Sequence, residues 1–279
     1  MSVHAQHTTD ETTPIQEETV SSQLLLVERQ DGVCTITLNR PSRRNALCPE
    51  LLDELNQELQ SLSQGPERRV IVLRGAGEQA FCSGYDLGDL ARPEVDVPPE
   101  ESMEKVVHSI KSYPYPVIAM IYGYAMGGGL GTAMACDLRI AADTAKFCMP
   151  PAKLGVIYTT SGLSDFVNAI GLANAKYLFF SGRIIDAQQA LRIGLVNEVV
   201  PAAELEDYVY ALADTMAANA PLSLSGTKTV LNRLACPSEL TSAEEEEFTA
   251  LRTRAFRSRD RKEAMEAFQQ HRTPTFLGE

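Results

Sequence analysis

The sequence predicts an α/β fold with a helical C-terminal part. Three observations support this prediction: strand and helix patterns alternate up to about residue 160, the pattern beyond is mainly helical, and the 279 residues are 44% apolar. Such alternation is typical of an α/β core in which helices cover a largely parallel sheet. A chain of this length can bury a sizeable core within one domain of ordinary size.

Strands and helices alternate through the N-terminal half of the chain. Residues 24–29 and 33–39 carry β-branched residues around the turn Asp31-Gly32, which predicts two strands. Residues 49–62 predict a helix with four leucines on one face, at Leu51, Leu55, Leu59 and Leu62. The segments that follow predict strands at 69–75, 116–123 and 137–143, and a helix at 102–113.

Most of the chain beyond residue 160 predicts helices. The helical segments are 161–172, 174–182, 186–194, 202–220, 222–235, 243–256 and 261–271. The first 22 residues are polar throughout and predict a disordered tail. We therefore divide the chain into a tail at 1–22, an α/β core at 23–205 and a helical C-terminal region at 206–279.

Charge and composition exclude several classes of function. The formal net charge is −12, which argues against nucleic acid as the main partner. No apolar run has the roughly 18 residues of a transmembrane helix, and the N-terminus does not have the pattern of a secretory signal. Six scattered cysteines form no CxxC pair and no metal-binding spacing, which predicts reduced thiols in a cytoplasmic protein without a metal site.

Three consecutive glycines follow the predicted strand at 116–123. The segment GYAMGGGLGTAMACD, residues 123–137, places Gly127, Gly128 and Gly129 where the chain enters a helix. Glycine permits close backbone approach and leaves amides accessible at a helix start, where an oxygen that gains negative charge would be stabilised. A tight turn or close helix packing would explain the same glycines, so both interpretations stand at this point.

A second segment also places a glycine where the chain leaves a predicted strand. The segment AFCSGYDLGDL, residues 80–90, places Gly84 just before Tyr85 and Asp86. Two such turns can direct two backbone N–H groups at one oxygen atom, which is the arrangement of an oxyanion hole. Together the two segments favour catalysis on a carbonyl group.

Five segments resemble the signature blocks of the crotonase (enoyl-CoA hydratase/isomerase) superfamily. They are RPSRRNAL at 40–47, AFCSGYDL at 80–87, GYAMGGG at 123–129, CDLRIAAD at 136–143 and GLVNEVV at 194–200. The resemblance implies a spiral of ββα units that acts on acyl-CoA thioesters, with a C-terminal region that forms a homotrimer or a dimer of trimers. It also implies that coenzyme A enters as part of the substrate and that no separate cofactor is needed.

The resemblance assigns the catalytic and binding positions. It places the oxyanion-hole amides on Tyr85 and Gly128, and the segment that wraps coenzyme A on residues 40–47. The substrate- and CoA-binding positions it implies are Arg40, Arg43, Arg44, Ala46, Leu47, Ser83, Gly84, Asp86, Leu87, Gly127, Gly131, Pro151, Phe268 and His271. Phe268 and His271 resemble residues that contact coenzyme A across a subunit boundary.

The two glutamates that hydratases of this superfamily carry are absent. The positions that match them are Gly131 and Pro151. A hydratase needs groups that activate water and move a proton to carbon, and neither residue can do this. The sequence therefore argues against simple enoyl-CoA hydration.

An oxyanion hole without a carboxylate base still suits decarboxylation, because the departing CO₂ leaves its electrons to form the enolate. The segment MPPAKLGVIY, residues 149–158, is similar to the matching block in the methylmalonyl-CoA decarboxylases of the superfamily. That similarity implies that Tyr158 faces the substrate carboxylate. Those decarboxylases have histidine and glutamate where this chain has Tyr85 and Gly131. A thioester hydrolase, a specialised hydratase or isomerase, and a non-catalytic acyl-CoA binder remain alternatives.

Overall fold

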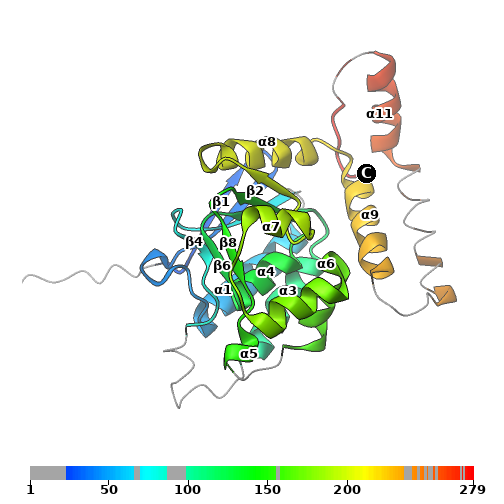
Figure 1. Cartoon of the computed structure of the whole chain (residues 1–279). Coiled ribbons are helices and arrows are strands. Elements are labelled where there is room, and N and C mark those ends of the chain that lie inside the picture. The colour runs from blue at the N-terminus through cyan, green and yellow to red at the C-terminus, as the bar shows by residue number, and fades with distance from the viewer. Residues whose placement is uncertain are drawn as a thin grey trace, which may run out of the picture.

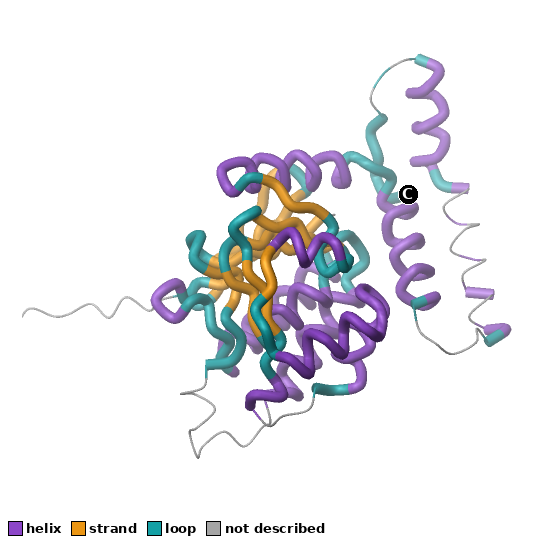
Figure 2. Tube along the Cα trace, in the orientation of Figure 1, coloured by secondary structure: helices purple, strands orange, loops and turns teal. Residues whose placement is uncertain are grey.

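A computed structural model describes most of the chain (Figures 1 and 2). The described residues are 23–65, 70–86, 99–154, 158–235, 241–243, 246, 247, 250, 254, 257–270, 272 and 274–279, and for 99, 100, 153, 154, 160, 261, 264, 265, 268 and 269 only the backbone is described. The tail predicted at 1–22 lies outside these residues. The structure is a mixed α/β fold, which confirms the predicted fold class.

A six-stranded sheet forms the centre of the fold, in the order β1-β2-β3-β5-β7-β10. Its strands are β1 Leu25–Gln30, β2 Val33–Leu38, β3 Val70–Gly75, β5 Val117–Ile121, β7 Leu138–Ala142 and β10 Glu198–Val200. The β1–β2 pair is antiparallel, and all other neighbours are parallel. Val33 pairs with Val70 and Leu38 pairs with Gly75, so β2 and β3 are in register along their whole length.

A second, four-stranded sheet was not predicted. Its strands are β4 Ala80–Cys82, β6 Tyr124–Met126, β8 Lys146–Cys148 and β9 Ile185–Asp186, in the order β4-β6-β8-β9. The chain passes from β5 to β6 at Gly123, whose φ is 55° and where a Cβ would lie 2.0 Å from the Gln79 carbonyl oxygen. The segment predicted as one strand at 116–123 is therefore the end of one sheet and the entry to another.

Helices cover both faces of the six-stranded sheet. On one face, α8 (Leu205–Ala217) packs through Leu205, Val209 and Ala213 against strand residues such as Val72 and Ile118. On the other face lie α1 (Pro49–Gln64), α3 (Pro99–Ser112), α4 (Gly128–Ala135) and α6 (Thr160–Ser181). The predicted leucine face of α1 is confirmed, because its four leucines are all buried. With both faces covered, the parallel strands carry apolar residues on both sides of the sheet, and every residue of β5 is buried.

The remaining helices complete the fold. They are η1 Pro41–Arg43, α5 Pro151–Leu154, α7 Ala187–Arg192, η2 Ala202–Glu204, α9 Pro221–Leu234 and α11 Arg259–Gln269. Helix α6 merges the two helices predicted at 161–172 and 174–182, with a non-helical kink at Gly171. Helices α9 and α11 stand to one side of the sheets as an arm that carries the C-terminus (Figure 1). None of the helices in the described part of the chain is long and apolar enough to cross a bilayer.

Candidate active site

Residues 40–47 form a tight loop held by a buried asparagine. Arg44 and Asn45 both have left-handed backbone conformations, with φ values of 52° and 55°. The Asn45 side chain donates to the Ala80 carbonyl at 2.7 Å and the Ala76 carbonyl at 3.1 Å, and it accepts from the Arg40 amide at 3.1 Å. Asparagine tolerates the left-handed region better than most residues, so the sequence and this loop agree locally.

This loop pairs with the strand exit at Tyr85. A parallel bridge joins Leu47 to Tyr85: the Leu47 amide donates to the Gly84 carbonyl at 2.8 Å, and the Asp86 amide donates to the Leu47 carbonyl at 2.9 Å. The Ser83 amide adds a hydrogen bond to the Arg44 carbonyl at 3.1 Å. In a parallel bridge the residue between the two bonded groups turns its own N–H to the opposite edge. The Tyr85 amide therefore points away from Leu47.

The start of α4 lies against the same strand exit. Gly127, the N-cap residue, has a φ of 49° and donates to the Cys148 carbonyl at 2.9 Å. At Gly129 a Cβ would lie only 2.4 Å from the Cys82 carbonyl oxygen, so this glycine permits the close packing of α4 on β4. Gly128 is the first residue of the helix, and helical bonding leaves its amide unused. The packing interpretation of the glycines thus applies to Gly129, and the site interpretation to Gly128.

Tyr85 and Gly128, the two predicted oxyanion-hole residues, lie next to each other. A Cβ on Gly128 would lie 3.1 Å from Tyr85 Cε2 and 3.2 Å from Leu47 Cδ1. A Cβ on Gly84 would lie 3.4 Å from the Gly128 amide nitrogen. The two backbone turns therefore meet, and the positive end of the α4 dipole lies at the same place. This arrangement can stabilise an oxygen that gains negative charge.

Tyr158 completes this region from a distant segment. A Cβ on Gly131 would lie 3.7 Å from Tyr158 Cε1 and 3.8 Å from Tyr158 Oη, next to Met103 Cε at 3.5 Å. The Tyr158 ring packs edge-on against buried Phe179, with ring centroids 5.5 Å apart. Burial raises the pKa of the Tyr158 phenol above its ordinary value, and nearby Cys82 raises the pKa further. The hydroxyl therefore stays protonated and can donate a hydrogen bond near neutral pH.

Tyr158 and Met103 are the nearest neighbours of a side chain placed at Gly131. Gly131 lies in the first turn of α4, where a longer side chain would point at the Tyr158 hydroxyl. The three atoms nearest to that position belong to Met103 and Tyr158, and none to a carboxylate. Pro151 is buried at the start of α5 and supplies no acid or base.

Arg40 and Asp86 interact with each other. Arg40 Nη1 donates to the Ala46 carbonyl at 2.7 Å, and Arg40 Nη2 lies 3.4 Å from Asp86 Oδ2. Arg43 and Arg44 are exposed on the same loop. The loop thus offers two outward-facing cations, while Arg40 contacts the protein itself.

The structure leaves some predicted residues apart from the site. Leu87 and His271 lie outside the described residues, and only the backbone of Phe268 is described, within α11. Helix α11 lies in the arm, far from α4 in Figure 1. Within one chain, therefore, the position of Phe268 is not brought to Tyr85 and Gly128.

Sequence reasoning missed two residues of this region. Met103, buried on α3, packs beside Gly131 and accepts from the Thr132 hydroxyl at 3.7 Å. Nothing in the helical pattern of α3 distinguishes Met103 from an ordinary core residue. Asn45 could have been identified from the sequence, because an asparagine in a turn segment often adopts the left-handed conformation.

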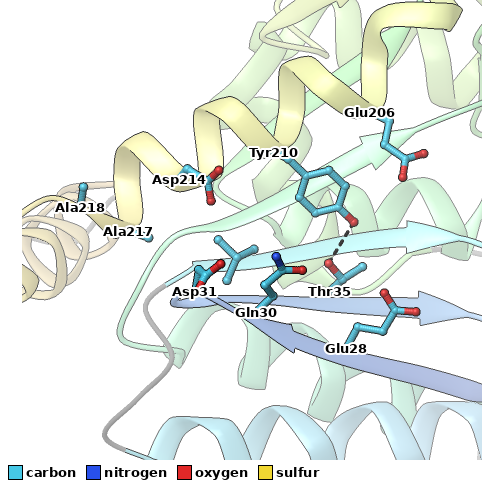
Figure 3. Close-up of a pocket in the computed structure, with 10 residues that line it drawn as sticks. Glu28, Gln30, Asp31, Thr35, Glu206, Tyr210, Asp214, Ala217 and Ala218 are labelled. Carbon is cyan, nitrogen blue, oxygen red and sulfur yellow. Dashed lines mark hydrogen bonds between the residues drawn. The ribbon is translucent and has the colours of Figure 1, made fainter.

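A separate cavity of about 590 Å³ lies between α8 and the β1–β2 edge of the sheet (Figure 3). Its acidic side chains come from both sides and are Glu28, Asp31, Glu206 and Asp214. Tyr210 and Thr35 form a hydrogen bond of 3.0 Å within it. Four carboxylates repel a ligand that carries phosphates, so this cavity does not suit an acyl-CoA thioester. None of the predicted site residues lines it.

Comparison with known proteins identifies the family. The sequence profile of the enoyl-CoA hydratase/isomerase family matches residues 28–279. A short-chain-enoyl-CoA hydratase of Clostridium acetobutylicum is 33% identical over 88% of this chain and 94% of its own length. A methylmalonyl-CoA decarboxylase of Escherichia coli is 33% identical over 93% of this chain and 100% of its own length. A crystal structure of an enoyl-CoA hydratase/carnithine racemase from Magnetospirillum magneticum superimposes with a TM-score of 0.86 at 33% identity, over 93% of this chain and 97% of that one. These matches confirm the resemblance drawn from the motifs, and the chain belongs to the enoyl-CoA hydratase/isomerase (crotonase) family.

Proposed function

We propose that this crotonase-family acyl-CoA enzyme decarboxylates a malonyl-type CoA thioester, such as methylmalonyl-CoA. One observation carries the proposal: the Tyr158 hydroxyl lies beside Gly131, 3.8 Å from where a side chain would begin. A neutral hydrogen-bond donor thus occupies the place where a hydratase of this superfamily carries a carboxylate. Such a donor can hold a substrate carboxylate through a hydrogen bond.

The reaction follows from two anchor points. The backbone N–H groups of Tyr85 and Gly128 donate to the thioester carbonyl oxygen, and the Tyr158 hydroxyl donates to the substrate carboxylate. With both ends held, the Cα–CO₂ bond can stand perpendicular to the thioester plane. The bond breaks, its electron pair enters the thioester as an enolate, CO₂ leaves, and a solvent proton then replaces it on Cα. No protein base is required, because no proton is removed.

The loop at 40–47 would hold the coenzyme A end of the substrate. The chain carries a net charge of −12, so a phosphate-rich ligand needs local cations. Arg43 and Arg44 are exposed on this loop, next to the bridge that carries Tyr85. Coenzyme A would bind as part of the substrate, with no further cofactor.

Hydration of an enoyl-CoA thioester is the second candidate reaction. The relatives include a short-chain-enoyl-CoA hydratase and a 2,3-dehydroadipyl-CoA hydratase of E. coli, the latter 34% identical over 91% of this chain. If this chain hydrates enoyl thioesters, it must activate water without carboxylates at Gly131 and Pro151. A thioester hydrolase, an isomerase or a non-catalytic acyl-CoA binder would use the same oxyanion hole and CoA loop.

The proposed oligomer is a homotrimer or a dimer of trimers. The α9–α11 arm leaves Leu231 and Leu234 about 60% exposed, and α6 leaves Phe180 75% exposed. Large exposed apolar side chains on α9 and α6 are typical of a surface that another chain covers. A neighbouring arm could also bring Phe268 and His271 to the coenzyme A of another subunit.

The test is a mass-spectrometric screen of the purified protein on malonyl-CoA, methylmalonyl-CoA and crotonyl-CoA. We expect CO₂ release from a malonyl-type thioester and hydration of crotonyl-CoA several orders of magnitude below that of a hydratase. Tyr158→Phe should lower kcat/KM for CO₂ release by roughly 10- to 1000-fold, the range for one oriented hydrogen bond to a charged group. Tyr177→Phe, an exposed tyrosine on α6, is the matched control.

Two outcomes would contradict the proposal. Equal rates for the wild type and Tyr158→Phe would remove Tyr158 from the mechanism. Release of CO₂ from none of the malonyl-type thioesters, together with rapid hydration of crotonyl-CoA, would establish the hydratase instead.

A further inference from the structure

We infer that the Arg40–Asp86 ion pair is a positioning device that holds the Tyr85 amide in the oxyanion hole. The inference rests on the oxyanion hole of the proposed function, but not on which reaction follows the enolate. It assigns Arg40 and Asp86 a role different from direct contact with coenzyme A.

The contacts of one guanidinium carry this inference. Arg40 Nη1 donates to the carbonyl of Ala46, which precedes Leu47, at 2.7 Å. Arg40 Nη2 lies 3.4 Å from the carboxylate of Asp86, which follows Tyr85. Leu47 and Tyr85 are the two members of the parallel bridge. Arg40 therefore spans both strands of the bridge at the point where the Tyr85 amide points away from Leu47.

The bridge needs such a tie because it is short and its loop is strained. It is a single bridge outside the named strands, so no neighbouring pairs on the same ladder hold its register. Arg44 and Asn45 occupy the left-handed region in succession, a conformation that persists only when surrounding contacts enforce it. The buried Asn45 side chain fixes one end of the loop, and the Arg40–Asp86 pair fixes the other.

The Arg40–Asp86 ion pair is largely buried. The side chains of Arg40 and Asp86 are only 17% and 12% exposed, in contrast to Arg43 and Arg44 on the same loop. The Asp86 carboxylate also offsets much of the Arg40 charge, which weakens its attraction for a phosphate. These features favour a positioning role for Arg40 and leave phosphate binding to the exposed arginines.

The experiment uses a readout that does not depend on turnover. Butyryl-CoA labelled with ¹³C at the thioester carbon is bound to the full-length protein, and difference infrared spectroscopy records its carbonyl stretch. A carbonyl that accepts two oriented hydrogen bonds absorbs at lower frequency than in water. The dissociation constant of the same ligand is measured at low and high salt.

We expect a lowered carbonyl frequency in the wild type and loss of most of that shift in Asp86→Asn and Arg40→Gln. The dissociation constant of butyryl-CoA should stay within about threefold of the wild-type value, because the coenzyme A contacts remain. The kcat for the proposed decarboxylation should drop about 10- to 100-fold, as for a misplaced oxyanion donor. Arg40→Lys separates the two roles, since lysine keeps the charge for a phosphate but cannot span both acceptors. A positioning role predicts that Arg40→Lys also loses the shift. Arg29→Gln is the matched control, because Arg29 forms a more exposed ion pair with Glu58.

Two results would overturn the inference. If Arg40→Gln and Arg40→Lys keep the carbonyl shift while Arg40→Gln weakens binding in a salt-dependent way, Arg40 is a coenzyme A ligand. If the folded wild type binds butyryl-CoA without any lowering of the frequency, the proposed oxyanion hole is wrong, and this inference is wrong with it.

Discussion

At the scale of single residues, the absence of a side chain at Gly131 leaves room for the hydroxyl of Tyr158 beside α4. Its neighbours Met103 and Tyr158 leave 3.5 to 3.8 Å around a Cβ, which is ordinary van der Waals contact. A methyl group fits that space, but a carboxylate arm must displace the Tyr158 ring. Glycine here and tyrosine at 158 thus depend on each other.

We expect Gly131→Ala to retain CO₂ release within about threefold and Gly131→Glu to reduce it about 100-fold, because only the longer side chain displaces the second anchor point. Release of CO₂ from methylmalonyl-CoA by the folded variants checks this. Gly226 on α9, with no atom within 4 Å of a Cβ, supplies the matched pair Gly226→Ala and Gly226→Glu. Undiminished decarboxylation by Gly131→Glu would show that Tyr158 does not act from this position.

The protonation of Tyr158 gives a prediction about pH. Burial raises the pKa of its phenol above the ordinary value of about 10, so the neutral donor persists throughout the neutral and mildly basic range. Because the folded protein holds this proton more tightly than the unfolded chain, Tyr158 contributes stability below pH 10 that is lost as pH rises through its folded pKa. An ultraviolet titration of the wild type against Tyr158→Phe should show no Tyr158 phenolate up to pH 10. A phenolate that forms near pH 8 would contradict the assignment of a neutral donor.

At the scale of elements, one buried lysine joins the arm to the core. Lys228 of α9 is 9% exposed, and its ammonium donates to Asp137 Oδ2 at 2.7 Å and to the Tyr115 carbonyl at 2.9 Å. The same Asp137 oxygen accepts from the Val117 amide at 2.7 Å. The contacts tie α9 to the start of β5 and to the turn between α4 and β7.

Lys228→Met should lower the free energy of unfolding by about 3 kcal/mol, because it leaves the Asp137 carboxylate without its cation in a partly buried place. Asp137 is 27% exposed, which keeps the expected loss at the lower end of the range for buried pairs. Urea unfolding of Lys228→Met against Lys176→Met, an exposed lysine on α6, measures the difference. Equal midpoints for the two variants would show that α9 is held by its other contacts.

At the scale of the whole molecule, clusters of charged side chains and exposed apolar side chains lie on different elements. The chain carries a net charge of −12 and four carboxylates line the cavity beside α8, whereas the loop at 40–47 presents the exposed Arg43 and Arg44. The apolar side chains gather on α6 and on the arm instead. Within one chain, the exposed arginines of the loop at 40–47 and the exposed apolar side chains therefore lie on different elements.

Sedimentation equilibrium should give the mass of three or six chains. Leu231→Glu with Leu234→Glu should shift the population toward monomers, because both leucines are about 60% exposed on the arm and charges there oppose apolar contact. Exposed Glu247→Gln serves as a control for altered charge in the C-terminal region. A wild type that stays monomeric at micromolar concentration would contradict the proposed oligomer.

The α/β class, the long helices and the two glycine turns can be predicted from the amino-acid pattern alone. These features are local: the leucine face of α1 follows from helical spacing, and Gly127 to Gly129 mark a helix start through backbone freedom alone. The family motifs added Tyr85 and Gly128 as partners, and the structure brings them together. The kink at Gly171 also agreed with a break between two predicted helices.

The second sheet and the contacts around the candidate site depend on how distant segments pack. Strands of two or three residues are too short for an alternating pattern, so the sequence does not distinguish β6 from the end of β5, whereas in the structure Gly123 crosses between the two sheets. The approach of Tyr158 to Gly131 and the span of Arg40 to Asp86 join segments distant in sequence. Such pairs form because two sheets and α4 fix where loops converge, and no local propensity specifies that distance.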